Sequence, residues 1–233
     1  MQDVKYNGIS GSSIGVFLKE RPPIPAARRR KEEYEIPGRD GTLTYTKSDY
    51  EKEEIKLKFN FISKSEQDWN NKAGKAKEWL LSGGTQLIFS DDPDHFYKVT
   101  AVEIDTIDRP SARVGTFTVK ITFESGLRYL LSGTKEIAYT AAKNNPYLLC
   151  KPIYKIIGEG VCTLTVNGKK VTANVGQNLT IDTELMMAYR TDGTLQNTAI
   201  TGNYDDLYLI PGSNTISVTP AFTLKIIPNW RCL

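Results

Sequence analysis

The chain has 233 residues, of which 39% are hydrophobic and 24% are charged, and its formal net charge is +3. This composition is typical of a folded globular protein, and the length is enough for one large domain or two ordinary ones. The small, evenly spread charge argues against nucleic-acid specificity, and no apolar run approaches the roughly 20 residues that span a membrane. The N-terminal residues show no secretory signal, so we expect the protein to fold in a cytoplasm without inserting into a membrane.

The chain begins with two predicted short strands within residues 3–18, followed by an extended arm at residues 19–31. Closely spaced prolines exclude a helix or a central strand from this arm. The arm ends in the basic cluster Arg28–Lys31, which is either a solvated loop or a contact with an acidic surface on a neighbouring protein. The cluster has no interleaved aromatic residues, so it does not indicate a nucleic-acid site.

Residues 35–62 predict a sharp turn followed by two strands. Pro37 presets its own φ, and Gly38 and Gly41 can adopt positive φ, so the chain is expected to reverse here. Hydrophobic and polar residues then alternate through residues 54–62, which is typical of a half-buried antiparallel strand. Because strands follow the turn, its glycines do not form a phosphate-binding loop. We expect this stretch to be the centre of an N-terminal domain.

A helix is predicted over residues 64–82. A capping box with Ser63 as the capping residue precedes it, and Gly83 follows it as a stop signal. Its apolar residues recur at helical spacing and form one stripe that must pack against a sheet. Trp79 lies beside this stripe and either joins the core or faces a partner.

Strands are expected again at residues 85–89, 96–107 and 113–125, with the acidic segment Ser90–His95 between the first two. Three aspartates and a histidine in this segment could suggest a metal site. However, Asp and Pro are preferred turn residues, and the segment lacks the glycine and the terminal glutamate of a calcium loop. The sequence therefore predicts a turn.

Residues 126–143 change in composition and separate two predicted domains, 1–131 and 132–233. The second shows about eight short strands and a hairpin turn at residues 166–169, which favours a β-sandwich of jelly-roll type. The predicted strands are residues 152–157, 161–166, 170–173, 178–182, 186–190, 206–209, 214–219 and 223–227. Its three cysteines have no metal-ligand spacing and are expected to be free thiols, with Cys150 and Cys162 in one core.

No catalytic constellation emerges from the sequence. Its single histidine, His95, lies in a predicted turn, and the paired aspartates also fall in turns. We therefore expect a protein that is not an enzyme and uses no cofactor or metal.

The order of these features resembles the distal tail protein (Dit) family of long-tailed phages. The resemblance rests on the segment Ile36–Gly41 before paired strands, on the helix, and on Phe89–Pro93 before the aromatic pair Phe96 and Tyr97. The C-terminal half adds four further segments, which are Asn144–Pro146, Gly158–Gly160, Leu179–Asp182 and Ile210–Asn214. Together the segments extend over nearly the whole chain.

The resemblance implies a mainly β fold. An N-terminal β-sandwich or split barrel with one amphipathic helix would be joined to a C-terminal galectin-like β-sandwich. It also implies a homohexameric ring at the virion tail tip, assembled in the host bacterial cytoplasm. The ring would be a hub that links the tail tube protein to the tail fibre or tail-associated lysin, with a receptor-binding protein as a further partner.

A closed ring needs two different contact patches on each subunit, and the proline-rich arm and the edge of the following strand are the candidates. The predicted interface residues are Pro22, Pro25, Arg28, Arg29, Arg30, Arg39, Leu43 and Tyr45. The alternative function is a carbohydrate-binding module for host-surface polysaccharide. Its candidate stacking residues are Tyr189, Tyr204, Tyr208 and Trp230. A tail-tube protein is less favoured because tube proteins usually have a single β domain.

Overall fold

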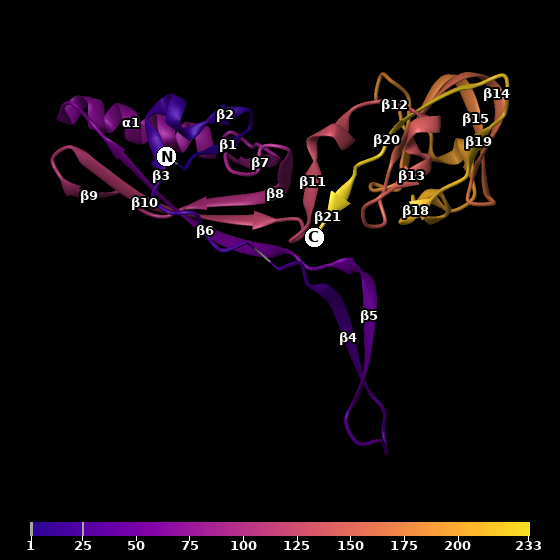
Figure 1. Ribbon diagram of the computed structural model, residues 1–233, viewed down its shortest axis with the longest axis horizontal. Coiled ribbons are helices and arrows are strands. Elements are labelled where there is room, and N and C mark those ends of the chain that lie inside the picture. The colour runs from indigo at the N-terminus through magenta and orange to yellow at the C-terminus, as the bar shows by residue number, and fades with distance from the viewer. Residues whose placement is uncertain (1, 25) are drawn as a thin grey trace. The chain divides into compact units, whose positions relative to one another are not determined.

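The computed structural model describes residues 2–24 and 26–233 (Figure 1). The chain divides into two compact units, Met1–Arg128 together with Leu233, and Tyr129–Cys232. Strands dominate both units, and α1 (Glu66–Leu80) is the α-helix of the described chain. The prediction of a mainly β protein with one amphipathic helix is confirmed, whereas a domain boundary at residue 131 stays a prediction. No helix in the described ranges is long and apolar enough to cross a membrane.

The N-terminal unit is built on one antiparallel sheet with the strand order β2-β1-β7-β8-β10-β6-β3, and β9 pairs with β10 (Figure 1). Its strands are β1 (Val4–Tyr6), β2 (Ile9–Ser10), β3 (Val16–Leu18), β6 (Glu53–Ile62), β7 (Gln86–Phe89), β8 (His95–Ile104), β9 (Asp108–Ser111) and β10 (Val114–Phe123). A short 3-10 helix, η1 (Gly11–Ile14), connects β2 to β3.

Strands β6 and β10 supply much of the core of this unit. They pair in continuous register from Ile62 opposite Val114 to Glu53 opposite Phe123. Side chains alternate between the two faces of a strand, so the hydrophobic residues of both strands share one face. The buried residues are Ile55, Leu57, Phe59, Phe61, Phe117, Val119, Ile121 and Phe123. The face predicted from the alternation in residues 54–62 is therefore confirmed.

Helix α1 packs its apolar stripe into this core. Trp69 contacts the ring of Phe61, with 5.6 Å between ring centroids, and Trp79 contacts Phe59 edge-on at 5.9 Å. Trp79 is 4% exposed, and its indole N–H donates to the carbonyl oxygens of Tyr6 and Ile9. Of the two positions considered for Trp79, it occupies the core.

The helix begins at a different cap from the one predicted. The Ser65 hydroxyl accepts a hydrogen bond from the Asp68 N–H at 3.2 Å, and the Asp68 carboxylate accepts one from the Lys64 N–H at 2.7 Å. Ser63 is buried, and its hydroxyl donates to the Arg113 carbonyl oxygen at 3.0 Å. The prediction of Ser63 as the cap was wrong, because Ser63 instead ties the end of β6 to the start of β10.

A hairpin separates β3 from β6 in the chain. It consists of β4 (Arg29–Glu35) and β5 (Thr42–Tyr50), which form a two-stranded sheet of their own (Figure 1). The turn at residues 36–41 is confirmed, and Gly38 and Gly41 in it have φ of 82° and 76°. The extended arm was predicted to reach Lys31, which was wrong for residues 29–31 because they pair with β5.

The C-terminal unit is built on a sheet with the order β12-β20-β14-β15-β16, to which β17 and β19 are added. The strands of this sheet are β12 (Ile137–Ala138), β14 (Ile153–Val166), β15 (Lys169–Asp182), β16 (Met187–Tyr189), β17 (Ile200–Thr201), β19 (Ile216–Val218) and β20 (Thr223–Ile227). Outside it, β13 (Asn144–Asn145) pairs with β18 (Gly212–Ser213), and β11 (Arg128–Leu130) pairs with β21 (Arg231–Cys232). The 3-10 helices of the unit are η2 (Leu131–Thr134), η3 (Tyr139–Lys143), η4 (Asn197–Ala199) and η5 (Tyr204–Leu207).

Strands β14 and β15 each replace two of the predicted short strands. They are 14 residues long and pair without a break in register. Gly158 and Gly160 in β14 have φ of 155° and 98°, and Gln177 in β15 has φ of 68°. These positions change the backbone direction while the hydrogen-bonded ladder continues. A further strand predicted at residues 206–209 was wrong, because Asp206 and Leu207 belong to η5 and Leu209 forms only an isolated bridge with Cys150.

The core of the C-terminal unit contains Cys150 and Cys162, as expected, and both are buried free thiols. Burial raises the pKa of each thiol, which keeps it protonated and unreactive. Tyr154 is also buried, and its hydroxyl donates to the Leu207 carbonyl oxygen at 2.6 Å. This bond holds η5 against the middle of the sheet.

Candidate functional site

The β4–β5 hairpin has two chemically different faces. Tyr34 lies opposite Leu43 and Glu32 lies opposite Tyr45, so these side chains share one face, which we call the aromatic face. The other face carries Glu33 opposite Thr44, flanked by further threonines and charged residues. A free-standing hairpin with one apolar face is poorly stable unless that face is covered.

Large hydrophobic side chains are exposed on the aromatic face and at the adjoining turn. The exposed fractions are 51% for Tyr34, 44% for Leu43, 59% for Tyr45 and 43% for Ile36. Scattered exposed hydrophobic residues are ordinary, whereas several on one face of a hairpin are typical of surfaces that a partner covers.

Ion pairs bracket this group along the same face. The Lys47 ammonium contacts the Glu32 carboxylate, which also accepts a hydrogen bond from the Tyr34 hydroxyl at 2.7 Å. These hydrogen bonds, first from Lys47 and then from Tyr34, hold the pKa of Glu32 below its usual range. Arg30 pairs with Asp49 at 3.3 Å. The polar contacts fix the two strands in register and leave the rings of Tyr34 and Tyr45 facing outward.

The predicted interface residues are distributed over this region. Arg29 and Arg30 lie in β4, Leu43 and Tyr45 lie in β5, and all four are exposed. Arg28 precedes β4 and Arg39 lies in the turn at residues 36–41, and both are exposed. Pro22 is buried in its own unit, and Pro25 lies outside the described residues. Their assignment to a subunit interface stays a prediction.

An exposed sheet edge near Leu43–Thr46 was expected to pair with a strand of a neighbouring subunit. β4 of the same chain pairs with one edge of that segment, and no other strand of the described chain pairs with β5, so the expected pairing stays a prediction. A strand from a neighbouring subunit could therefore pair only along the opposite edge of β5.

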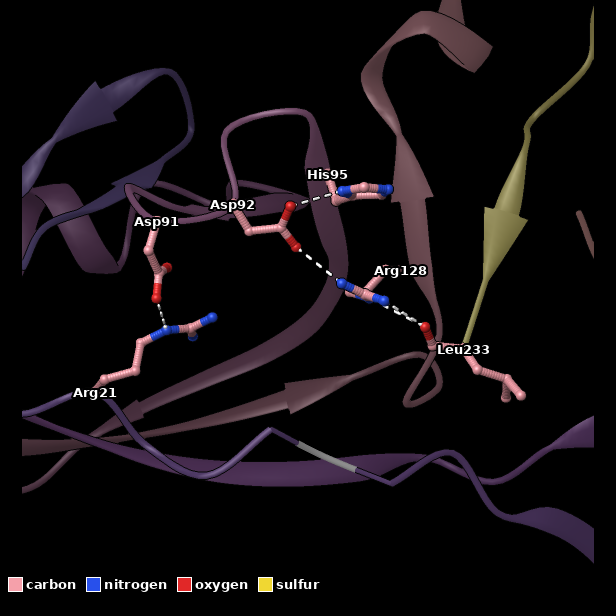
Figure 2. A network of polar contacts seen from close by, with 6 residues as sticks. All are labelled: Arg21, Asp91, Asp92, His95, Arg128 and Leu233. Atoms are coloured by element: carbon pink, nitrogen blue, oxygen red, sulfur yellow. Dashed lines mark hydrogen bonds and ion pairs between the residues drawn. The ribbon is translucent and has the colours of Figure 1, made fainter.

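The start of the arm is held by its own unit. The Lys19 N–H donates to the Lys58 carbonyl oxygen at 2.8 Å. Figure 2 shows the Arg21 guanidinium donating to the Asp91 carboxylate, at 2.6 Å. The same guanidinium lies 3.8 Å from the centroid of the Phe89 ring, a stacked position that favours a cation. The arm therefore leaves the sheet from a fixed point.

Asp92 is the centre of a second polar network in Figure 2. Its carboxylate accepts hydrogen bonds from His95 Nδ1 at 2.7 Å and from Arg128 Nη1 at 3.1 Å. Burial opposes ionisation of Asp92, but the hydrogen bonds from His95 and Arg128 outweigh it and hold the pKa of Asp92 below its usual range. The segment is a turn, as predicted, and no group of acidic, histidine and cysteine side chains in the described ranges is arranged to hold a metal ion.

The aromatic residues of the carbohydrate alternative have mixed surroundings. Trp230 is 9% exposed and packs against Tyr147, with 6.0 Å between ring centroids. It is therefore a core residue, which corrects its assignment as a stacking platform. The remaining candidates, Tyr189, Tyr204 and Tyr208, are half-buried. Their role in sugar binding stays a prediction.

Sequence reasoning missed a groove on the outer face of β14 and β15. It has a volume of about 570 Å³ and is lined by Thr172 and Asn174 of β15, by Val161 of β14, and by the segment 190–201. The outward direction of Thr172 and Asn174 could be read from the alternation with buried Val171, Ala173 and Val175. The position of the segment that forms the wall had no comparable signal.

Comparison with known proteins identifies the class of the N-terminal unit. Residues 9–123 match the family described as the phage tail protein RIFT-related domain. The matched residues include the whole of the sheet from β3 to β10, helix α1 and the β4–β5 hairpin. No curated protein sequence matches the chain.

A comparison with solved structures extends the likeness to the whole chain. The fold is similar to that in the crystal structure of SPP1 Dit (gp 19.1), described as a paradigm of the hub adsorption apparatus in phages that infect Gram-positive bacteria. The TM-score is 0.67 at 14% sequence identity, and the match covers 97% of this chain and 98% of that one. Residues 9–123 therefore carry a phage tail protein domain, and the chain as a whole has a fold similar to that of SPP1 Dit, which confirms the resemblance noted from its sequence.

Proposed function

We propose that the protein is the structural hub at the distal end of a phage tail and works as a homohexameric ring. The phage tail domain in residues 9–123 and the likeness of the whole chain to SPP1 Dit, a hub protein by its description, support this function. The observation that carries the proposal is the β4–β5 hairpin, whose aromatic face is exposed in the single chain. Such a face is stable when a neighbouring subunit covers it.

Ring closure requires that the hairpin of one subunit meets a different patch on the next, because each contact in a ring is heterologous. The arm and hairpin suit this role, since Arg21 fixes the point where the arm leaves its own sheet. An interface that is fixed before association loses less conformational entropy on binding. In the assembled tail, the ring would join the tail tube protein to a tail fibre or tail-associated lysin and to a receptor-binding protein. Its role is to position these partners, without catalysis.

The experiment is a measurement of solution mass with variants of the two hairpin faces. The double variant Leu43→Glu, Tyr45→Glu places charges on the aromatic face, and Thr44→Glu is the matched control on the opposite face. We expect the unmodified chain and the control to show six times the monomer mass of 26.1 kDa by light scattering. The double variant should dissociate, because a buried unpaired charge at an interface costs about 2 kcal/mol or more.

Two outcomes would contradict the proposal. If the unmodified chain is a monomer both alone and when mixed with the adjacent tail proteins, the proposal of a homohexameric ring is wrong. An unchanged hexamer for the double variant would leave the ring in place but exclude the aromatic face as its contact. Circular dichroism of each variant, at the same concentration, shows whether the fold is retained.

A further inference from the structure

The groove on β14 and β15 lies entirely within the C-terminal unit and is distinct from the hairpin. Its floor is the outer face of the sheet, where Thr201 of β17 pairs opposite Thr172, and Asn174 lies opposite Val161. The segment that follows β16 supplies the wall, with Gln196 and Thr198. A curved sheet face with a polar wall has the shape of a ligand site.

The polar side chains of this groove are not used within the chain. Thr172, Asn174, Arg190, Gln196, Thr198 and Thr201 make no side-chain hydrogen bond or ion pair to any other described residue. Elsewhere in the same unit, comparable residues have partners. For example, Asn178 accepts hydrogen bonds from the Thr191 N–H and hydroxyl at 2.8 and 2.9 Å. This hollow therefore concentrates hydroxyl, amide and guanidinium groups that are available to hydrogen-bond a ligand.

The glycine at residue 176 leaves room for the Arg190 guanidinium. Its guanidinium lies over Gly176, and a Cβ at that position would come within 2.5 Å of Arg190 Nη2. Gly176 does not have a positive φ, so no backbone requirement explains the glycine there. The absence of a side chain at residue 176 lets the guanidinium lie close to the sheet at one end of the groove.

The charges in the groove are balanced. Arg190 is its cation and Glu159 is its anion, and these two residues form no ion pair with each other. The Glu159 carboxylate instead accepts the Gln177 N–H at 3.0 Å, which fixes it at the rim. A fixed carboxylate disfavours phosphate and other anions. Val161, which is 66% exposed, adds an apolar surface.

We infer that this groove binds a neutral saccharide. Sugars present many hydroxyl groups, which can both donate and accept, together with an apolar face of C–H groups. The amides of Asn174 and Gln196, the threonine hydroxyls and the Arg190 guanidinium supply matching donors and acceptors. Val161 supplies a surface for the C–H face. The site uses no aromatic platform, in contrast to the one expected from the sequence, and it goes beyond the structural role of the ring.

The test is saturation-transfer difference NMR on the full chain, which detects small molecules weakly bound to a protein of 26.1 kDa or larger. The probes are lactose, maltotriose and chitotriose as neutral saccharides, with glycerol phosphate as an anionic comparison. We expect at least one neutral saccharide to give a saturable signal at millimolar concentration, and glycerol phosphate to give none.

Three surface variants locate the site. Thr172→Val removes a hydroxyl from the floor, and Thr165→Val is its matched control on the same face of β14, outside the groove. Gly176→Ala keeps Arg190 but displaces its guanidinium. We expect Thr172→Val and Gly176→Ala each to weaken binding about tenfold, as expected for the loss of a hydrogen bond to a ligand, while Thr165→Val leaves it unchanged.

The inference is overturned if no saccharide of the panel binds, if glycerol phosphate binds more tightly than every saccharide, or if the groove variants bind like the control. The hexamer mass measured on the same samples reports separately on the ring. A failure of sugar binding with an intact ring therefore leaves the proposed function unaffected.

Discussion

The Arg128 guanidinium donates two hydrogen bonds to the carbonyl oxygen of Leu233, from Nε at 3.1 Å and from Nη2 at 2.7 Å (Figure 2). Its Nη1 donates to the Asp92 carboxylate. The Arg128 side chain thus joins the turn after β7 to Leu233, which lies 105 positions after Arg128 in the chain. We expect Arg128→Ala to lower the free energy of unfolding by about 1–2 kcal/mol, because the group is partly exposed and its hydrogen bonds are charge-assisted. Urea unfolding measures the change. Arg113→Ala, at an exposed position of the same unit, is the control and should change stability by less than about 0.5 kcal/mol.

The Asp92 network also predicts how stability depends on pH. The pKa of Asp92 is lower in the folded protein than in the unfolded chain, where it is about 3.9. The ionised carboxylate therefore contributes stability above about pH 4, and this contribution is lost as the pH falls through the folded pKa. Asp92→Asn removes the contribution at neutral pH, so the difference in stability between the two proteins should shrink from pH 7 to pH 3. Asp94→Asn, in the same turn, is the comparison, and an equal pH dependence for both variants would contradict the role of Asp92.

The helix cap gives a prediction that separates two nearby serines. Ser65→Ala removes the hydroxyl that accepts the Asp68 N–H, and it should destabilise the protein by about 1 kcal/mol. Ser63→Ala should also destabilise the protein, but by removing the hydrogen bond to Arg113 between β6 and β10. Hydrogen exchange distinguishes the two effects. The amides of the first turn of α1 should lose protection in Ser65→Ala and retain it in Ser63→Ala.

The same substitution at two glycines should have opposite effects. The Phe61 ring lies over Gly115, its partner across the strands, and a Cβ on residue 115 would overlap that ring. Gly115→Ala should therefore cost about 1–3 kcal/mol through overpacking. Gly74 lies inside α1 with open space around it, so Gly74→Ala should stabilise the protein by about 0.5–1 kcal/mol. Thermal unfolding of both variants tests this, and a loss of stability in Gly74→Ala would show that the helix needs its glycine.

The sequence predicted those elements whose pattern is local. The alternation in residues 54–62 identified the buried face of β6, and the spacing of Trp69, Ala73, Ala76 and Leu80 identified the helix. The position of the cap was missed because Ser63 and Ser65 are both good caps in sequence. Only the long-range bond from Ser63 to Arg113 separates them.

The errors elsewhere have a common physical cause. Gly158 and Gly160 look like a break between strands, but the pairing with β15 carries the strand through them. Residues 29–31 follow closely spaced prolines and look irregular, but β5 supplies partners for their backbone. The groove was missed because it is formed when the segment after β16 lies over a sheet face. No local pattern records that contact.

The two strands of the hairpin have very different outer edges. Strand β4 has charged side chains at nearly every position, whereas β5 begins with the uncharged run Thr42–Thr46. Within the described chain, no other strand pairs with either of them. Charged side chains along a strand blunt its edge against pairing with another chain, and β4 has this protection, whereas the uncharged run in β5 does not. At high concentration, unassembled subunits are therefore expected to aggregate first through residues 42–46. Co-expression with the adjacent tail proteins should prevent this aggregation.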